Sequence, residues 1–570
     1  MLKKVLKRLS ADRNFAKAAI LIFLGTASWS LTMVKSGLIY PFGMGFWGAN
    51  GHDGIWHIAL INSLAKGSLE MPTFAGEQLK NYHIGFDLLM AFLHKLTTVP
   101  VVTLYFQIVP PLLALLVGIL TYKFVMEWKK SETAAFWATF FVYFGGSFGW
   151  MIDLFRGKGL GGESMFWSQQ GISSLINPPF ALSLVMILAG LIFVLKLTKK
   201  FSWTSFILAT IFLGLTFEVK VYAGILLLGG LLVATLKNRK FFWVFLSSLT
   251  ISLVLFFAFN RGSTGLLVFK PFWFLETMMG LSDRFYWPRF YSAMTNYKLG
   301  RVWLKEIPAY LVAFAIFYVG NMGTRLIKEF AVWKGIKDVK LADYMDLFFT
   351  SVIVAGAILP MFFLQEGTPW NTIQFFYYSL FAASVLAGVA MAEILSRLRL
   401  RQSIVVASVV LLTIPTTIGT LVEVYLPARP PAKISNEELS ALSFLAKQKE
   451  GVVLTFPFDS IAAKEAEANP PRSLYLYEST AYVSAFSNKP TFLEDEVNLD
   501  ITGYDWRKRR KEVQEFYTSL DHALVRNFLK KNNITYIFWL KGQRATLGES
   551  QLGLTQIFEN DEVLIYRTSI

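Results

Sequence analysis

Residues 179–197 read PFALSLVMILAGLIFVLKL, an apolar run whose single charge, Lys196, lies next to its end. A helix needs about 20 such residues to cross the hydrocarbon core of a bilayer. Comparable runs recur at about 18–38, 102–122, 133–154, 202–218, 220–236, 240–259, 303–324, 343–364, 371–395 and 403–425. The sequence therefore predicts an α-helical polytopic membrane protein with about eleven transmembrane helices.

The composition supports this class. Of the 570 residues, 54% are hydrophobic and only 16% are charged, whereas about a quarter of the residues of soluble domains are charged. Cytosolic enzymes and nucleic-acid-binding proteins are excluded on this ground, and membrane lipids are the expected surroundings. The chain contains no Cys, which excludes disulfides and thiolate metal sites.

The distribution of Lys and Arg predicts an orientation. With residues 1–17 in the cytoplasm, the predicted cytoplasmic connections hold 23 Lys and Arg residues and the outer connections hold 12. This excess is typical of proteins inserted in the plasma membrane, the cytoplasmic membrane of a prokaryote. A further apolar stretch at 84–97 is too short to span, so we expect a juxtamembrane helix there, within a first outer loop at 38–101.

The composition changes after the transmembrane region, 18–425. Residues 426–570 begin with a proline-rich linker and hold 18 basic and 19 acidic residues. Ser435 and Glu438 form a capping box that predicts a helix to about 449. Strands are expected at 451–456, 475–483, 535–540 and 563–566, and helices at 505–518 and 520–532. We therefore expect a small extracytoplasmic α/β domain, for recognition or packing, without a catalytic motif.

Histidine is concentrated in the first outer loop, which holds four of the five His residues, namely His52, His57, His83 and His94. The segment from Gly51 to His57 is expected to open a helix that runs to about Lys66. Asp53 and His57 are four residues apart and share a helix face, so they suit a divalent cation or an oriented general base. The alternative is that Asp53 only caps the helix.

Other polar residues of the outer side are weaker candidates. Lys80 and His83 suit a phosphate at the membrane surface, or simple interfacial anchoring. Glu218 and Lys220 lie between two apolar runs, where ionisable groups are costly unless they pair or line a cavity. The remaining candidates are His52, Asp153 at the outer end of the third span, Arg284 among aromatic residues, and Glu366 in the last outer loop.

This arrangement resembles the membrane glycosyltransferases of the GT-C fold, which include protein O-mannosyltransferases, aminoarabinose transferases and oligosaccharyltransferases. The matching features are the whole plan of the chain, the acid Asp53 early in the first outer loop, and Tyr82-His83 ahead of a juxtamembrane helix. The sequence departs from the family pattern in two places. Asp53 is followed by Gly54 rather than by a second acid, and no prolines follow His83.

The resemblance implies transfer of a sugar from a polyprenyl-phosphate carrier to a glycan, lipid or protein acceptor on the outer face. It implies that Asp53, or else Asp153, acts on the acceptor, and that the donor phosphate meets cations such as Lys80, His83, Lys220 and Arg284. Asp53, His57 and Asp153 would suit Mg, Mn or Zn, although some family members work without metal. The alternatives are a lipid or polysaccharide transporter or flippase, and a non-catalytic scaffold with this fold.

Overall fold

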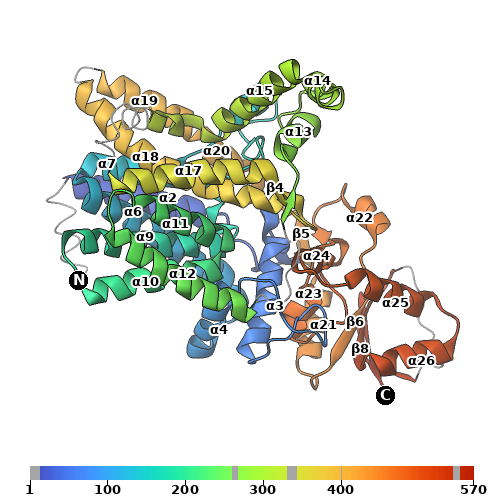
Figure 1. The fold of residues 1–570 in the computed structure, drawn as a ribbon. Helices are drawn as coiled ribbons and strands as arrows, with labels where there is room; N and C mark the ends of the chain where they lie inside the picture. The colour runs from blue at the N-terminus through green and yellow to red at the C-terminus, as the bar shows by residue number, and fades with distance from the viewer. Residues whose placement is uncertain (1–12, 260–266, 330–342, 399–400, 544–552, 570) are drawn as a thin grey trace.

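The computed structural model describes residues 13–259, 267–329, 343–398, 401–543 and 553–569. Figure 1 shows a bundle of long helices and, beside one end of it, a smaller region of helices and strands built from the last part of the chain. The predicted combination of an apolar helical bundle and a C-terminal α/β region is confirmed.

Seven helices among the described residues are long and apolar enough to cross a membrane. They are Val101–Lys129, which comprises α5 (Val101–Thr103), η2 (Leu104–Ile108) and α6 (Val109–Lys129); α9 (Pro178–Lys199); α12 (Lys240–Phe259); α15 (Trp303–Met322) with η4 (Gly323–Ile327); α17 (Tyr344–Phe362); η5 (Pro369–Ile373) with α18 (Gln374–Arg397); and α19 (Gln402–Thr413), α20 (Pro415–Thr420) and η6 (Leu421–Tyr425). An eighth span would join α7 (Glu132–Phe144) and α8 (Gly149–Phe155), which bend by 48° at their junction.

All eleven predicted stretches fall on helices, but not all of those helices have the length of a span. α10 (Trp203–Val219) and α11 (Val221–Ala234) have 17 and 14 residues and are separated only by the extended residue Lys220. At 1.5 Å per residue, 14 residues cover about 21 Å, which is less than the hydrocarbon core. The two helices contact each other and form a hairpin in the bundle. The predicted first span is occupied by α2 (Arg13–Ser30), which packs on α6 and α7.

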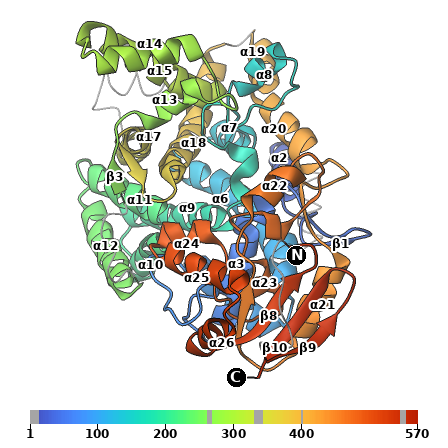
Figure 2. The same cartoon turned by 90° about the vertical axis from the view of Figure 1, so that its right-hand side faces the viewer.

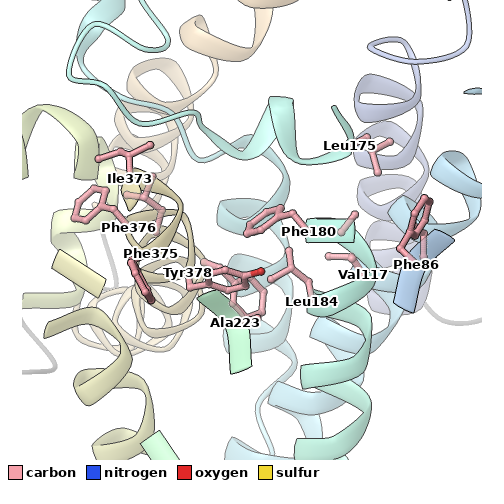
Figure 3. Close-up of a cluster of buried hydrophobic side chains, with 14 of the residues drawn as sticks. Phe86, Val117, Leu175, Phe180, Leu184, Ala223, Ile373, Phe375, Phe376 and Tyr378 are labelled. Carbon is pink, nitrogen blue, oxygen red and sulfur yellow. The ribbon is translucent and has the colours of Figure 1, made fainter. Parts of the chain in front are cut away.

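The bundle is held by close helix contacts and by buried aromatic rings. A Cβ on Gly388 of α18 would lie 2.1 Å from the backbone nitrogen of Ala138 on α7, so these helices touch through their backbones. Figure 3 shows Phe180 of α9 beside Tyr378 of α18 in the buried cluster. The Tyr378 hydroxyl lies 2.7 Å from Ser183 Oγ, so this buried polar group is satisfied without water.

The first outer loop contains the two helices that its sequence predicts. The expected helix of residues 51–66 is α3 (Asp53–Ala65), and the expected juxtamembrane helix is α4 (Gly85–Thr97). α4 exposes Phe92 and Leu96 and buries Asp87 completely. This combination suits a helix lying at a membrane surface with its polar side turned to the protein.

The C-terminal region is built around a four-stranded sheet. Its strand order is β6 (Val452–Thr455), β8 (Ile534–Leu540), β10 (Val563–Thr568) and β9 (Leu554–Glu559); β6 and β8 are parallel and the other pairs are antiparallel. The predicted helices are α21 (Asn436–Ala446), α25 (Trp506–Thr518) and α26 (His522–Lys531), and the capping box of Ser435 and Glu438 is present. Three short helices complete the region: α22 (Ser460–Ala466), α23 (Tyr482–Ser487) and α24 (Glu496–Thr502).

The strand predicted at 475–483 was wrong. The segment holds the end of the short 3₁₀ helix η7 (Leu474–Leu476) and the start of α23. The carboxylate of Glu494 accepts hydrogen bonds from the backbone N–H groups of Val483 and Ser484, at 3.0 and 2.9 Å. A carboxylate that satisfies N–H groups at a helix start stabilises the helix, and local alternation of apolar residues gives no sign of such a distant partner.

The first outer loop and the C-terminal region share a second sheet. Its order is β1 (Ile39–Tyr40), β2 (Gly43–Phe46), β5 (Ala432–Ile434) and β7 (Arg472–Ser473), with β2 antiparallel to β5. Seen from the side of the C-terminal region, α23 lies next to α3, and the two helices are in contact (Figure 2). The boundary expected at 426 therefore separates parts of the sequence that pack as one structure.

Candidate active site

A cavity of about 220 Å³ lies where the first outer loop meets the helical bundle. Its lining comes mainly from the start of α3, from η3 (Gly171–Leu175) and the residues beside it, and from α9, η5 and α18. The lining residues with polar side chains or aromatic rings include Trp29, Asp53, Gln169, Gln170, Ser173, Ser174, Asn177, Arg325, Trp370, Asn371, Gln374, Tyr377 and Ser384. Asp53 is the only carboxylate among the described residues that line this cavity, and Arg325 is the only cation.

The predicted base Asp53 is placed at the cavity by the start of α3. It is the first helical residue, whereas His52 occupies the N-cap position, and no side chain caps this helix end. The alternative that Asp53 serves only as a cap therefore does not describe this structure. Its side chain is exposed.

Two further predicted residues, His57 and His83, lie behind Asp53 in a buried polar cluster. His57 Nδ1 lies 2.7 Å from Asp87 Oδ1, and the exposed fractions of these two side chains are 2% and 0%. The imidazole of His57 also stacks on Tyr105. Burial lowers the pKa of His83 well below its usual value, and the charges of Lys220 and His57 add to this effect. His83 is therefore a neutral side chain at pH 7 and not a cation for a phosphate.

Lys220 and Glu218 do not pair with each other. Lys220 Nζ lies 3.3 Å from Asn177 Oδ1, and Asn177 lines the cavity. Glu218 accepts a hydrogen bond of 3.0 Å from the backbone N–H of Ile84, directly before α4. Glu218 thus ties the tip of the α10–α11 hairpin to the first outer loop. Lys220, at the same tip, reaches a residue that lines the cavity.

Arg325 is a site residue that was not predicted, because in the sequence it follows an apolar run and falls within a predicted cytoplasmic connection. Its side chain is 1% exposed and donates to the carbonyls of Met322 and Asn321 and to Gln170 Oε1. No ion pair of Arg325 with a carboxylate is present among the described residues. An arginine at the end of an apolar run resembles an interfacial anchor in sequence, so no local signal distinguishes it.

Glu163 lies next to this part of the cavity and was also missed. It accepts hydrogen bonds from the backbone N–H of Gln170, at 2.7 Å, and from Ser173 Oγ, at 2.8 Å. Burial raises its pKa to about 7. Glu163 therefore holds in place two residues that line the cavity.

The other predicted residues lie outside the cavity lining. Asp153 is on α8, where its charged neighbours are Lys158 and Arg156. Lys80 Nζ lies 4.6 Å from the ring centre of Tyr504 and so contacts the C-terminal region. Glu366 is exposed. The set of Asp53, His57 and Asp153 is not brought together, and the described residues contain no group of three His, Asp or Glu side chains arranged for a metal ion.

Arg284 and His52 do not line the cavity either. The guanidinium of Arg284 stacks on Trp167 at 4.2 Å and donates to Ser164 Oγ at 3.3 Å. His52 Nδ1 is hydrogen-bonded to Ser479 Oγ of the C-terminal region, and its ring packs against Tyr477. His52 therefore joins the cavity side of α3 to the C-terminal region.

Comparison with solved structures places this arrangement in a known fold. The archaeal oligosaccharyltransferase AglB from Archaeoglobus fulgidus, in complex with an inhibitory peptide and a dolichol-phosphate, matches 93% of this chain and 69% of its own, with a TM-score of 0.51 and 11% identity. The fold is of the GT-C type. The apo form of the Archaeoglobus fulgidus oligosaccharyltransferase matches 92% and 69% of the two chains, with a TM-score of 0.50 and 10% identity. No protein-family model matches the sequence, and a search of curated proteins finds no match.

Proposed function

We propose that this chain is an integral membrane glycosyltransferase that moves a sugar from a polyprenyl-phosphate-linked donor to an acceptor on the outer face of the membrane. The observation that carries the proposal is the lining of the cavity. One carboxylate, Asp53, and one buried cation, Arg325, line it together with the amides Gln169, Gln170, Asn177, Asn371 and Gln374. Amide side chains hydrogen-bond to sugar hydroxyls, and the rings of Trp370 and Tyr377 suit the apolar face of a sugar.

The charged groups have complementary tasks in this reaction. Asp53 accepts the proton of the acceptor hydroxyl or amide as that group attacks the anomeric carbon of the sugar. The bond from that carbon to the carrier oxygen breaks, and the leaving phosphate takes up the negative charge. Arg325 is the cation of the cavity that would meet this charge, because its guanidinium is fixed by three hydrogen bonds.

The fold likeness supports the same class of donor. The solved AglB structure holds a dolichol-phosphate and an inhibitory peptide. By analogy, we propose a lipid-phosphate carrier as the donor of the present chain. The acceptor is a glycan, a lipid or a protein. The apolar helices of the bundle suit the prenyl chain of such a donor.

The test is transfer of labelled sugar from membrane lipid, with the wild type compared to Asp53→Asn and to the matched variant Asp153→Asn. We expect Asp53→Asn to lose a factor of about 10²–10⁴ and Asp153→Asn to stay near the wild-type rate. Loss only in Asp153→Asn would move the base to α8. No transfer by the folded wild type with a panel of carrier lipids would favour a transporter, a flippase or a non-catalytic scaffold.

A further inference from the structure

The residues that the sequence offered for a divalent cation do not fit one. No group of three His, Asp or Glu side chains among the described residues is arranged for a metal ion, and Asp153 lies beside Lys158 and Arg156 instead of joining Asp53 and His57. One nitrogen of the His57 imidazole is already held by Asp87 at 2.7 Å. The described residues thus offer no preformed three-ligand site for a metal ion, and a cation built into the chain is the other source of positive charge near Asp53.

A buried lysine, Lys220, is the candidate for the positive charge that a metal ion would otherwise supply. Lys220 is 3% exposed, and the carboxylates whose charges act on its ammonium are Asp53 and Asp87. The only hydrogen bond of its ammonium to a described residue is the one to Asn177, a residue that lines the cavity with Asp53. This buried ammonium forms no ion pair with a described carboxylate, but it is held next to the cavity through Asn177 and supplies positive charge there that does not depend on an ion from solution.

The backbone around Lys220 holds this charge in place. Lys220 is extended, with φ −158° and ψ 109°, between the end of α10 and the start of α11. The carboxylate of Glu218 is bonded to the backbone of Ile84, and α4, which carries Asp87, begins at the next residue. A Cβ on Gly85 would lie 3.0 Å from the Glu218 carbonyl oxygen, so the hairpin tip and the start of α4 are in close contact.

We infer that Lys220 is the resident cation of this site and that the site works without a divalent metal. Lys220 compensates the charge of Asp53 and Asp87, and it acts on the cavity as a positioning residue through its hydrogen bond to Asn177. The effect of Lys220 on sugar transfer rests on the proposed function. Metal binding is measured separately and does not depend on that function.

The first experiment measures Mn²⁺ binding to the purified full-length protein by the electron paramagnetic resonance signal of free Mn²⁺. We expect no stoichiometric binding at micromolar Mn²⁺. One bound Mn²⁺ per chain that disappears in Asp53→Asn would overturn the inference. This result does not require sugar transfer, so it remains decisive even when the proposed function fails.

The second experiment measures transfer by Lys220→Arg, Lys220→Met and the control Lys489→Met, with and without EDTA. Lys489 is also a buried lysine, 2% exposed, but it lies in the C-terminal region. We expect wild-type transfer to be unchanged by EDTA, Lys220→Met to lose at least about 100-fold, and Lys220→Arg to keep most of the rate because it keeps the charge. Loss of wild-type transfer in EDTA with recovery in Mn²⁺, or full activity of Lys220→Met, would refute the assignment.

Discussion

Replacing Arg325 by methionine tests whether the buried cation of the cavity binds the donor phosphate. The guanidinium is 1% exposed and lines the cavity with Asp53, and its hydrogen bonds go to two carbonyls and an amide oxygen rather than to a carboxylate. Its positive charge is therefore available to an anionic ligand. Methionine keeps much of the length of the side chain and removes only the charge and the donors.

The expected loss can be worked from this geometry. Two unit charges about 4 Å apart, in surroundings with an effective dielectric constant of about 20, attract by about 4 kcal/mol. Since about 1.4 kcal/mol corresponds to a factor of ten, the loss of this contact lowers kcat/KM by about 10²–10³ after partial compensation by neighbouring amides. The assay is the initial rate of transfer from a lipid-linked donor at several donor concentrations, with thermal unfolding measured in parallel.

Lys328→Met is the matched control. Lys328 is a buried cation, 2% exposed, three residues further along the chain, but it pairs with Glu329 and Tyr318 and does not line the cavity. We expect it to lower stability and leave kcat/KM within about threefold, which is below 1 kcal/mol. An equal loss of transfer in Arg325→Met and Lys328→Met would refute a specific role of Arg325 in binding the donor phosphate. Removal of either buried cation would then be enough to lower the rate.

Three further predictions concern stability. Trp56→Ala removes a ring that is 1% exposed between α3 and the C-terminal region, so it should cost about 3–5 kcal/mol and increase protease cleavage of that region in detergent. Gly388→Ala forces a Cβ against Ala138 and should lower the melting temperature by the equivalent of about 1–3 kcal/mol, whereas Gly229→Ala, with no neighbour within 4 Å, should change it little. Burial raises the pKa of Glu494 to about 8, above its ordinary 4.5, so its contribution to stability is present at low pH and is lost as the pH rises through about 8. Glu494→Gln should flatten this pH dependence of the melting temperature between about pH 4.5 and 8, and an unchanged slope would assign it to another group.

Features with a local cause could be predicted from the sequence. The apolar runs, the capping box of Ser435 and Glu438 and the juxtamembrane helix α4 depend on residues next to each other in the chain, and all are present. Asp53 could be selected because a carboxylate early in a long histidine-rich outer loop is unusual. Its place on the cavity agrees with that choice, although its role in catalysis remains a prediction.

Features that depend on distant packing could not be predicted. Arg325 reaches the cavity only because η4 packs against the break between α7 and α8, where a Cβ on Gly145 would lie 3.3 Å from the Arg325 side chain. Asp87 is on an amphipathic helix, where a carboxylate ordinarily faces water, and its partner His57 is 30 residues away in the chain. The strand predicted at 475–483 failed for the same reason, since Glu494 stabilises a helix start there.

The hydrogen bonds between β2 and β5 limit how the chain can thread through a bilayer. Backbone groups that bond to each other lie on the same side of the membrane, so the chain between Phe46 and Ala432 must cross it an even number of times. The seven apolar helices all lie between these two residues, and seven is an odd number. Seven crossings would leave β2 and β5 on opposite sides, so the parity calls for one more, for which the bent pair of α7 and α8 is the candidate among the described helices; the hairpin of α10 and α11 adds either two crossings or none. Single-site accessibility labelling on the two sides of the bent pair would reveal this parity without any assay of activity.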